Sequence, residues 1–203
     1  LVLYRNRGNA TSPDWQYDTS DFAGVSPGWW AYPALGDVTN DSVPDLFVGA
    51  DDGTVSIYYS GGTPAAPTWP ALPDVSLSAG NNAAPALDDL DGDGDLDLLV
   101  GHGAGTLYHF ENTGSLANPA WTERTSNYGD INEAADGLQP AFIDLDGDTK
   151  RDLLVGLGGQ LIWYRRSGTA ANPNWTRVAS DPIGYGGGSS GTSPAVGDWD
   201  GDG

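Results

Sequence analysis

Short apolar runs bounded by aspartate and glycine recur along the chain. They read Asp-Leu-Phe-Val-Gly at 45–49, and Asp-Leu-Leu-Val-Gly at 97–101 and 152–156. An unbroken apolar run of this length is typical of a strand that is buried on both faces. After each run come a glycine-containing turn and a segment of β-branched and aromatic residues, at 55–59, 107–110 and 161–164. Each run and the segment after it therefore predict a β-hairpin.

Two further markers indicate that these hairpins belong to an internal repeat. A segment beginning Pro-Ala precedes each hairpin, and its proline recurs with spacings of 52, 55 and 54 residues, at Pro33, Pro85, Pro140 and Pro194. A tryptophan recurs with spacings of 54, 52 and 54 residues, at Trp15, Trp69, Trp121 and Trp175. Two independent markers share one period, so we interpret the chain as repeats of about 54 residues.

The repeat predicts an all-β fold made of β-propeller blades. No window keeps helical spacing of apolar residues, and four short strands in each period of about 50 residues are typical of a four-stranded antiparallel blade. One small sheet cannot bury both of its faces, whereas stacked blades can. We expect the end of one blade at 1–32, repeats at 33–84, 85–139 and 140–193, and the start of a further repeat at 194–203. We also expect the chain to form part of a larger propeller or assembly, because a closed ring of four blades would lack one central strand.

Charge is concentrated in loops that follow the Pro-Ala segments. The formal net charge is −20, and 25 Asp stand against 3 Glu, 7 Arg and 1 Lys. Positions one, three, five and nine of four loops hold 14 of the 25 Asp. With position seven included, the candidate metal-ligating residues are Asp37, Thr39, Asp41, Val43 and Asp45; Asp89, Asp91, Asp93, Asp95 and Asp97; Asp144, Asp146, Asp148, Lys150 and Asp152; and Asp198, Asp200 and Asp202.

Calcium is the ion that this arrangement favours. Four carboxylates within nine residues repel one another, and a hard divalent cation that accepts six to eight oxygen ligands would remove the repulsion. Magnesium is less favoured because it demands stricter octahedral geometry. We expect position seven to offer its backbone carbonyl, with the Lys150 ammonium pointing away, and Gly92 and Gly147 to adopt positive φ. An EF-hand is excluded because Val100 and Val155 stand where it requires glutamate.

The pattern Pro-Ala-x-x-Asp-x-Asp-Gly-Asp-x-x-x-Asp-Leu-Leu-Val-Gly, with the aromatic strand, Asn-x-Gly and Asn-Pro-x-Trp after it, resembles the FG-GAP/VCBS repeat over essentially the whole chain. The resemblance implies calcium-binding β-propeller blades, like those of integrin α heads, some fungal lectins and large secreted bacterial proteins. It implies that the aspartates at positions one, three, five and nine are side-chain ligands. Thr39 departs from the pattern, which puts full affinity of the first loop in doubt.

Several functional classes are disfavoured. The strong negative charge argues against binding of nucleic acid or of an anionic membrane surface, and no apolar run is long enough to span a membrane. Zero Cys removes disulfides and thiolate chemistry. His102 and His109 are the only histidines, and no hydrolase or phosphate-binding motif is present, so we expect no enzyme. We interpret the Arg165–Arg166 pair as a solvated strand end.

We therefore expect an extracellular calcium-binding propeller module with a structural, adhesion or assembly role. Its expected partners are calcium, a protein or a glycan, and further copies or a continuation of this chain. The alternatives are a carbohydrate-binding lectin propeller and, less favoured, the propeller domain of a carbohydrate-active enzyme. Trp29, Trp30, Tyr32, Tyr58 and Tyr59 could stack on a sugar ring, although packing between blades is the stronger interpretation of these aromatic residues.

Overall fold

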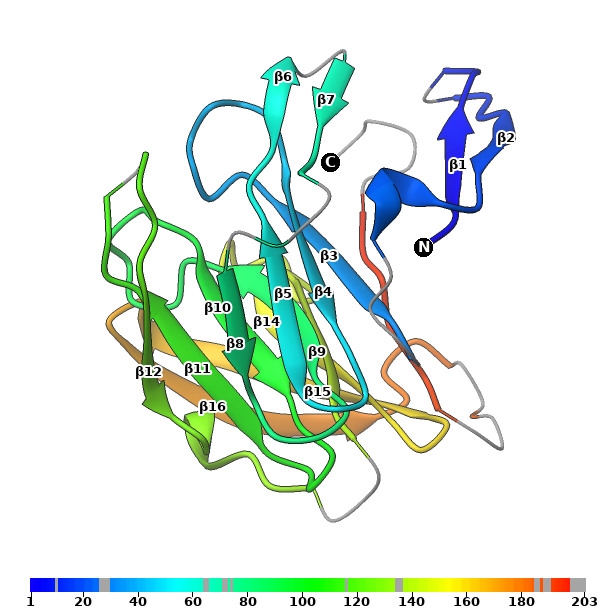
Figure 1. The fold of residues 1–203 in the computed structure, drawn as a ribbon. Helices are drawn as coiled ribbons and strands as arrows, with labels where there is room; N and C mark the ends of the chain where they lie inside the picture. Colours follow the sequence, from blue (N-terminus) through cyan, green and yellow to red (C-terminus); the bar gives the residue numbers. More distant parts are fainter. Residues whose placement is uncertain are drawn as a thin grey trace.

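A computed structural model describes residues 1–9, 11–25, 30–63, 66–70, 73, 75–115, 117–133, 137–184, 187 and 191–197. Most of the described chain forms antiparallel β-sheets (Figure 1). The first four-stranded sheet has the order β3 (Tyr32–Gly36), β4 (Asp45–Gly49), β5 (Thr54–Tyr58) and β8 (Val75–Ser78). The second has β9 (Ala84–Asp88), β10 (Asp97–Gly101), β11 (Leu107–Asn112) and β12 (Trp121–Thr125). The third has β13 (Gln139–Ile143), β14 (Asp152–Leu157), β15 (Gln160–Thr169) and β16 (Asn172–Ser180).

Two small hairpins lie outside these sheets. They pair β1 (Leu3–Asn6) with β2 (Trp15–Thr19), and β6 (Gly61–Thr63) with β7 (Ala66–Thr68). The repeat pattern did not predict the β6–β7 hairpin, which lies between β5 and its partner β8 along the chain. The helical segments of the described residues are two 3₁₀ turns, Phe22–Gly24 and Tyr128–Asp130. None of the described helical segments has the length or the apolar character needed to span a membrane.

The apolar runs form the second strand of each sheet, as the sequence predicts. Every residue of β4 and β10 is buried, as are the first five residues of β14. Each of these strands lies between two neighbours, so that its backbone is paired on both sides. The polar first residue and the glycine end each five-residue run, while the apolar residues between them face the adjacent sheets. The runs therefore mark the centre of each sheet.

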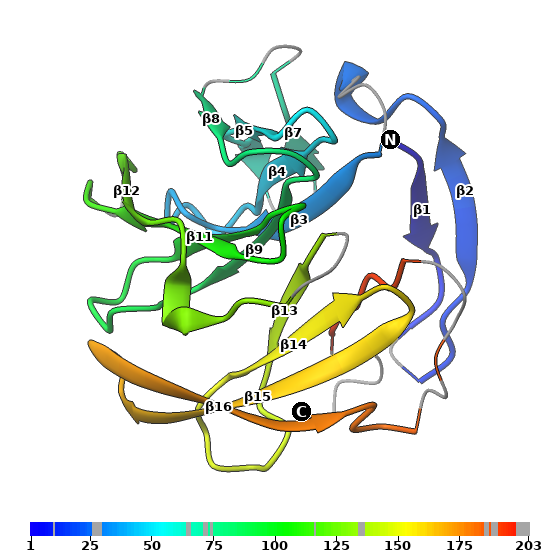
Figure 2. The same cartoon turned by 90° about the horizontal axis from the view of Figure 1, so that it is seen from below.

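The first strands of the sheets surround a common centre. Figure 2 shows the three sheets and the β1–β2 hairpin arranged around it, with β3, β9 and β13 nearest to it. Strand β9 contacts both β3 and β13. An apolar cavity of about 610 Å³ lies here, lined in part by Pro33–Leu35, Pro85–Leu87, Pro140–Phe142 and Pro194–Val196. The Pro-Ala segments of four repeats thus meet at one place, which is the arrangement of propeller blades.

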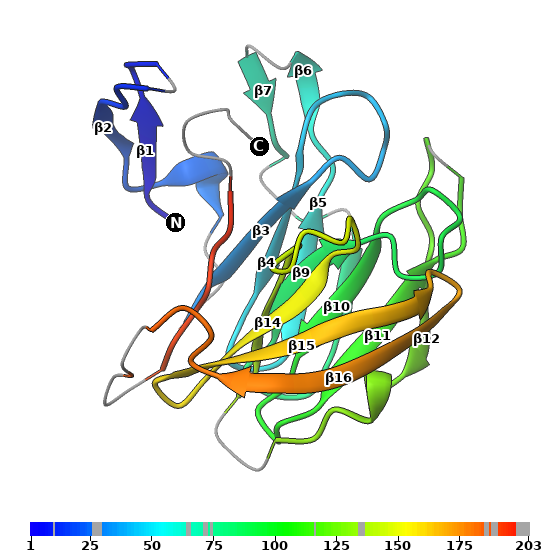
Figure 3. The same ribbon diagram turned by 180° about the vertical axis from the view of Figure 1, so that it is seen from behind.

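The core lies between neighbouring sheets, and Figure 3 shows the third sheet lying across the face of the second. One cluster joins the first and second sheets and includes Phe47, Ile57, Leu98 and Phe110. A second cluster joins the second and third sheets. The periodic tryptophans Trp121 and Trp175 pack against these two clusters, and Trp121 lies edge-on to Phe47 with ring centroids 5.7 Å apart. Burial between stacked sheets therefore supplies most of the apolar contact.

Successive repeats also touch through a glycine and a proline. Each apolar run ends in a glycine, at Gly49, Gly101 and Gly156. A Cβ atom on any of these glycines would overlap a backbone carbonyl oxygen of the segment that leads into the next repeat. For Gly101 that oxygen belongs to Leu138, and Pro140 Cδ would lie 2.9 Å from the added carbon. Glycine is required at this position because the chain entering the next sheet crosses directly over it.

The all-β propeller-blade prediction is confirmed, with each described sheet remaining open rather than closing on itself. The expected repeat limits stay a prediction. The first strands begin at Tyr32, Ala84 and Gln139, each one residue before the limit that the prolines suggest.

Candidate functional site

The aspartate loops connect the first and second strands of each sheet and follow one backbone path. The fourth and sixth positions adopt positive φ in all three described loops: Asn40 and Ser42, Gly92 and Gly94, and Gly147 and Thr149. The predicted left-handed conformation of Gly92 and Gly147 is confirmed, with φ of 88° and 76°. The sequence did not indicate that the sixth position shares this conformation. These two reversals turn each loop back on itself, and in the second and third loops early carboxylates converge.

The aspartate at position nine of each loop is the first residue of the second strand and is fully buried. Asp45, Asp97 and Asp152 are 0%, 1% and 0% exposed. Asp97 accepts hydrogen bonds from the N–H groups of Leu90 at 3.0 Å and Asn112 at 2.9 Å. The equivalent donors to Asp45 are Val38 and Ser60, and those to Asp152 are Leu145 and Arg166. The ninth aspartate therefore fastens the loop to the backbone in or just after the third strand.

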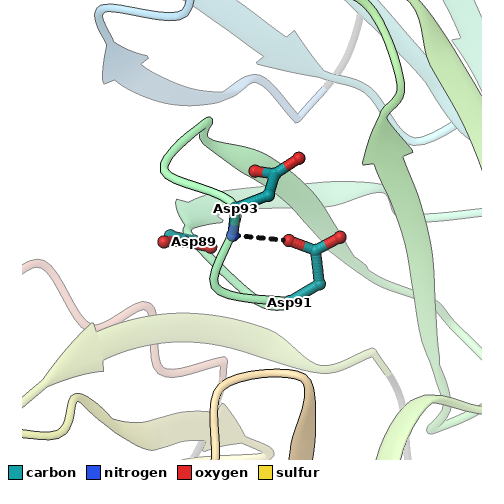
Figure 4. A group of neighbouring side chains, drawn as sticks. All are labelled: Asp89, Asp91 and Asp93. Carbon is teal, nitrogen blue, oxygen red and sulfur yellow. Dashed lines mark hydrogen bonds between the residues drawn. The ribbon is translucent and has the colours of Figure 1, made fainter.

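In the second loop, Asp89, Asp91 and Asp93 converge (Figure 4). One carboxylate oxygen from each lies within 4.8 Å of the others. The Asp89 carboxylate accepts hydrogen bonds from the N–H groups of Gly92 at 2.6 Å and Gly94 at 3.2 Å. Asp91 accepts one from the N–H of Asp93 at 3.1 Å. The loop backbone thus holds the carboxylates in place.

The charge of this cluster is not balanced by a cationic side chain. In the described part of the chain, no Lys, Arg or His nitrogen lies within 4.0 Å of the carboxylates of Asp89, Asp91 or Asp93. Burial raises the pKa of Asp91, and the nearby charges of Asp97 and Asp93 raise it further. The pKa of Asp95 is raised in the same way, by burial and then by the neighbouring aspartates. A cation that bound here would relieve this repulsion.

The third loop brings Asp144, Asp146 and Asp152 together, with oxygens within 4.8 Å of one another. Here the expectation for Lys150 is wrong: its ammonium does not point away but lies 3.0 Å from Asp148 Oδ2. The backbone N–H and the ammonium of Lys150 together lower the pKa of Asp148. Both partners are largely solvent-exposed, so the pair is weak and a bound ion could displace it.

The first loop does not form such a cluster. Asp37 accepts hydrogen bonds from the N–H groups of Asp41 at 3.1 Å and Ser42 at 2.8 Å. Thr39 turns its hydroxyl to Asp45 Oδ2 at 3.3 Å, so it does not supply the oxygen that an aspartate would add to the cluster. This agrees with the doubt that Thr39 raises. Asp198, Asp200 and Asp202 of the fourth loop lie outside the described residues.

The remaining predicted ligands lie outside the two carboxylate clusters or would contribute only a backbone carbonyl. Asp95 is partly exposed beside the second cluster, and Val43 is buried at position seven of the first loop. The Val43 carbonyl accepts a hydrogen bond from the Ser60 hydroxyl at 3.2 Å. Coordination by these residues and by the ninth aspartates stays a prediction.

A buried ion pair that the sequence did not indicate lies beside the second loop. The Arg165–Arg166 interpretation is wrong for Arg166, whose side chain is 7% exposed and lies 3.3 Å from Asp88 Oδ2. Arg165 is half-exposed. Adjacent strand residues point to opposite faces, so a pair of arginines could not both be solvated on a strand that packs on one face. Arg151 lies 3.3 Å from the other Asp88 oxygen.

The aromatic residues divide between packing and exposure. Tyr58 is buried, and the Tyr59 hydroxyl accepts a hydrogen bond from Trp121 Nε1 at 3.1 Å, so this pair serves blade packing. Trp30, in contrast, is 70% exposed. Together with Tyr32, Asn82 and Gln139 it lines a hollow of about 200 Å³. Trp29 lies outside the described residues.

The donor set of the second and third loops fits a hard divalent cation. It consists of carboxylate oxygens on short side chains, converging from one loop, with no thiol or imidazole among them. Oxygen donors of this kind suit calcium and magnesium rather than softer metals. In the second loop the uncompensated charge adds to this fit.

Comparisons with known proteins identify the repeat. No curated protein and no solved structure matched the chain. The FG-GAP-like repeat matched three times, over residues 37–100, 89–155 and 144–203, and each match spans from one aspartate loop to the following one. These matches cover well over half of the chain. It therefore belongs to the FG-GAP-like repeat family.

Proposed function

We propose that this protein is a calcium-binding propeller module whose ions stabilise the aspartate loops. The observation that carries the proposal is the convergence of Asp89, Asp91 and Asp93 without a neighbouring cation. Membership of the FG-GAP-like repeat family supports the same assignment. Calcium tolerates irregular oxygen geometry, which suits a loop whose ligands come from one short stretch of backbone.

Within each loop, different residues would bind the ion, turn the backbone and anchor the loop to the sheet. The carboxylates at positions one and three would hold the ion, together with position five in the second loop and position nine in the third. The residues of positive φ turn the loop so that these groups face inward. The buried ninth aspartate anchors the loop to the sheet through backbone N–H groups. The second and third loops are the proposed strong sites, and the first loop is the weak one because Thr39 faces Asp45.

We further propose an extracellular, non-enzymatic role in structure, adhesion or assembly. Extracellular calcium suffices for sites of micromolar to millimolar affinity. The aspartates are arranged for an ion rather than for proton transfer, and the rigid stacked sheets suit a scaffold that presents loops to a partner.

A calcium titration followed by thermal unfolding tests the ion assignment. We expect the melting temperature in calcium to exceed that in EGTA, because an ion that binds only the folded loops adds its binding free energy to stability. Asp93→Asn should remove part of this increase, and the matched variant Asp52→Asn, on an exposed turn outside the loops, should leave it intact. Equal melting temperatures of the wild type in calcium and EGTA would contradict the proposal.

Glycan binding is a second candidate function, and it rests on Trp30. An indole that is 70% exposed beside Tyr32 and two amide side chains offers an apolar face and hydrogen-bonding groups for a sugar ring. The hollow lies where the first strands begin, so it is at the opposite end of these strands from the aspartate loops. Binding to a panel of neutral glycans should fall in Trp30→Ala and persist in Trp15→Ala. Equal glycan binding by the two variants would rule out this site.

A further inference from the structure

The guanidinium of Arg166 reaches from the third sheet into the aspartate loop of the second. Its Nη1 donates a hydrogen bond to Asp88 Oδ2 at 3.3 Å. Its Nη2 faces the carbonyl oxygens of Asp89 at 3.5 Å and Leu90 at 3.4 Å, which are the first two residues of the loop. The guanidinium also lies 5.7 Å from the ring centroid of Trp175. The side chain is thus buried between two sheets and holds the loop by its backbone.

Arg166 is the exception among three structurally equivalent residues. Ser60, Asn112 and Arg166 each donate a backbone N–H to the ninth aspartate of their own loop. Asn112 turns its side chain into its own blade, where Oδ1 accepts hydrogen bonds from the N–H groups of Gly114 and Ala120. Ser60 likewise donates to Val43 within its own blade. Only Arg166 among the three sends its side chain to the neighbouring blade.

Through its backbone Arg166 is also tied to the third loop. Its N–H donates to Asp152 Oδ1 at 2.8 Å, and the Asp152 carboxylate belongs to the third cluster with Asp144 and Asp146. A second link runs parallel to it, since Arg151 at position eight of the third loop lies 3.3 Å from Asp88 Oδ1. One contiguous set of contacts therefore joins the two proposed ion sites.

We propose that Arg166 is a positioning residue that makes the second and third loops bind divalent cations cooperatively. This inference rests on the proposed calcium function. An ion in the third loop would fix Asp152, and with it the backbone of Arg166. The guanidinium then holds the Asp89 and Leu90 carbonyls, which places the Asp89 carboxylate. The second ion meets a loop that is already ordered, so less conformational entropy is lost when it binds.

Calorimetric calcium titration of single-site variants tests the coupling directly. Asp93→Asn disables the second loop and Asp146→Asn disables the third, so each variant reports the affinity of the other site. With Arg166 present, we expect the intact site of each variant to bind calcium at least about fivefold more weakly than the same site does in the wild-type protein. A factor of about five is the lower end of the usual coupling between two binding sites. The effect must be reciprocal, because coupling of two binding equilibria is symmetric.

The same two variants in an Arg166→Gln background complete the cycle. There we expect the affinity of each site to depend much less on whether the other is disabled, because only the parallel Arg151–Asp88 link remains. Arg166→Lys keeps the positive charge but has one nitrogen in place of the two guanidinium nitrogens that contact Asp88 and the second loop. It should reduce the coupling, and it replaces Arg166→Gln if the glutamine substitution prevents folding. Arg177→Gln is the matched control: Arg177 lies on β16 and pairs with Glu133 at 2.9 Å, away from both loops, and its loss should leave the coupling unchanged.

The outcomes separate this inference from the function on which it rests. Two sites that bind calcium independently in the wild type would overturn the coupling and leave the calcium function standing. Coupling that survives unchanged in both Arg166 variants would overturn the role of Arg166. Absence of calcium binding in the wild type would overturn both proposals together. A purely structural role would lower the stability of Arg166→Gln equally with and without calcium, without changing the coupling.

Discussion

At the scale of single residues, the loop path is the same whatever residue type occupies it. The fourth and sixth positions adopt positive φ with Asn and Ser in the first loop, two Gly in the second, and Gly and Thr in the third. A β-branched residue is strained in this region because its Cβ crowds the backbone. Thr149, with φ of 71°, is therefore the clearest strained residue of the three described loops.

Thr149→Gly should stabilise the protein by up to about 1 kcal/mol, because glycine adopts positive φ without a steric cost. The hydrogen bond from the N–H of residue 149 to Asp144 Oδ2 would remain, since it is made by the backbone. The measurement is urea denaturation in EGTA, which removes any contribution from ions. The same substitution at exposed Thr176 in strand β16 is the control and should destabilise; stabilisation at both positions would refute the argument.

Spacing along the chain predicted the positive φ of Gly92 and Gly147, because a glycine between aspartates in a tight loop has a local cause. The spacing could not show which of the nine positions of each aspartate loop are buried and which are exposed. Asp97 is buried against two N–H groups while Asp93 is exposed, although the two look alike in the sequence. Arg166 was misjudged for the same reason, since its partner Asp88 is 78 residues away along the chain.

At the scale of elements, each second strand ends where the next blade begins. The carbonyl of Leu138 and the ring of Pro140 lie against Gly101 at the end of β10. Any side chain at this glycine must displace backbone rather than a mobile side chain, and backbone yields little in a packed core.

Gly101→Ala should therefore destabilise the protein by about 3 kcal/mol or more, at the upper end of what overpacking costs. Gly61→Ala provides the comparison, because an added Cβ there meets nothing closer than the Thr68 hydroxyl at 3.4 Å. That change should stay within about 0.5 kcal/mol of the wild type. Guanidinium denaturation of both variants in saturating calcium gives the two values, and similar values for the two would show that the blade contact is looser than the structure indicates.

The predicted hairpins are present in the structure, but the predicted ends of their strands are less accurate. The second hairpin strand was expected at 161–164, whereas β15 extends from Gln160 to Thr169 and pairs with the similarly long β16. The equivalent segment of the second sheet continues less regularly, with Asn112 Oδ1 accepting hydrogen bonds from the N–H groups of Gly114 and Ala120. Local patterns therefore indicated the strands but not where their pairing stops.

At the scale of the whole molecule, acidic groups outnumber basic ones by 20, so that few carboxylates have a basic partner. Asp88 is among those that do, yet burial raises its pKa to about 6 despite the nearby Arg151 and Arg166. A carboxyl whose pKa is higher in the folded protein than in the unfolded chain binds protons more tightly when folded. Its contribution to stability is therefore present at low pH and is lost as pH rises through about 6.

In EGTA, the free energy of unfolding of the wild type should rise between pH 7 and pH 5 by about 1 kcal/mol more than that of Asp88→Asn, which lacks this titration. Denaturation at both pH values measures the difference. Glu123→Gln, an exposed change on β12, should follow the wild type. A wild type and an Asp88→Asn variant with the same pH dependence would show that Asp88 keeps an ordinary pKa when folded.

The period of the sequence predicted that the blades stack, because each sheet has apolar residues on faces that only a neighbour can cover. The period of the sequence could not predict which contacts hold particular blades together. The pairing of Trp121 with Phe47 and that of Arg166 with Asp88 depend on distances between residues more than 70 positions apart, for which no local pattern exists.

The contact between Gly101 and Pro140 bears on how such repeats can be exchanged. The glycine closes the apolar run of one repeat and the proline opens the next, so half of each junction is encoded on either side of the motif boundary. A repeat cut out at its own motif limits would carry two unmatched halves. The natural unit for duplication, shuffling or design is therefore the segment from the middle of one blade to the middle of the next, which transfers every glycine together with the proline that it accommodates.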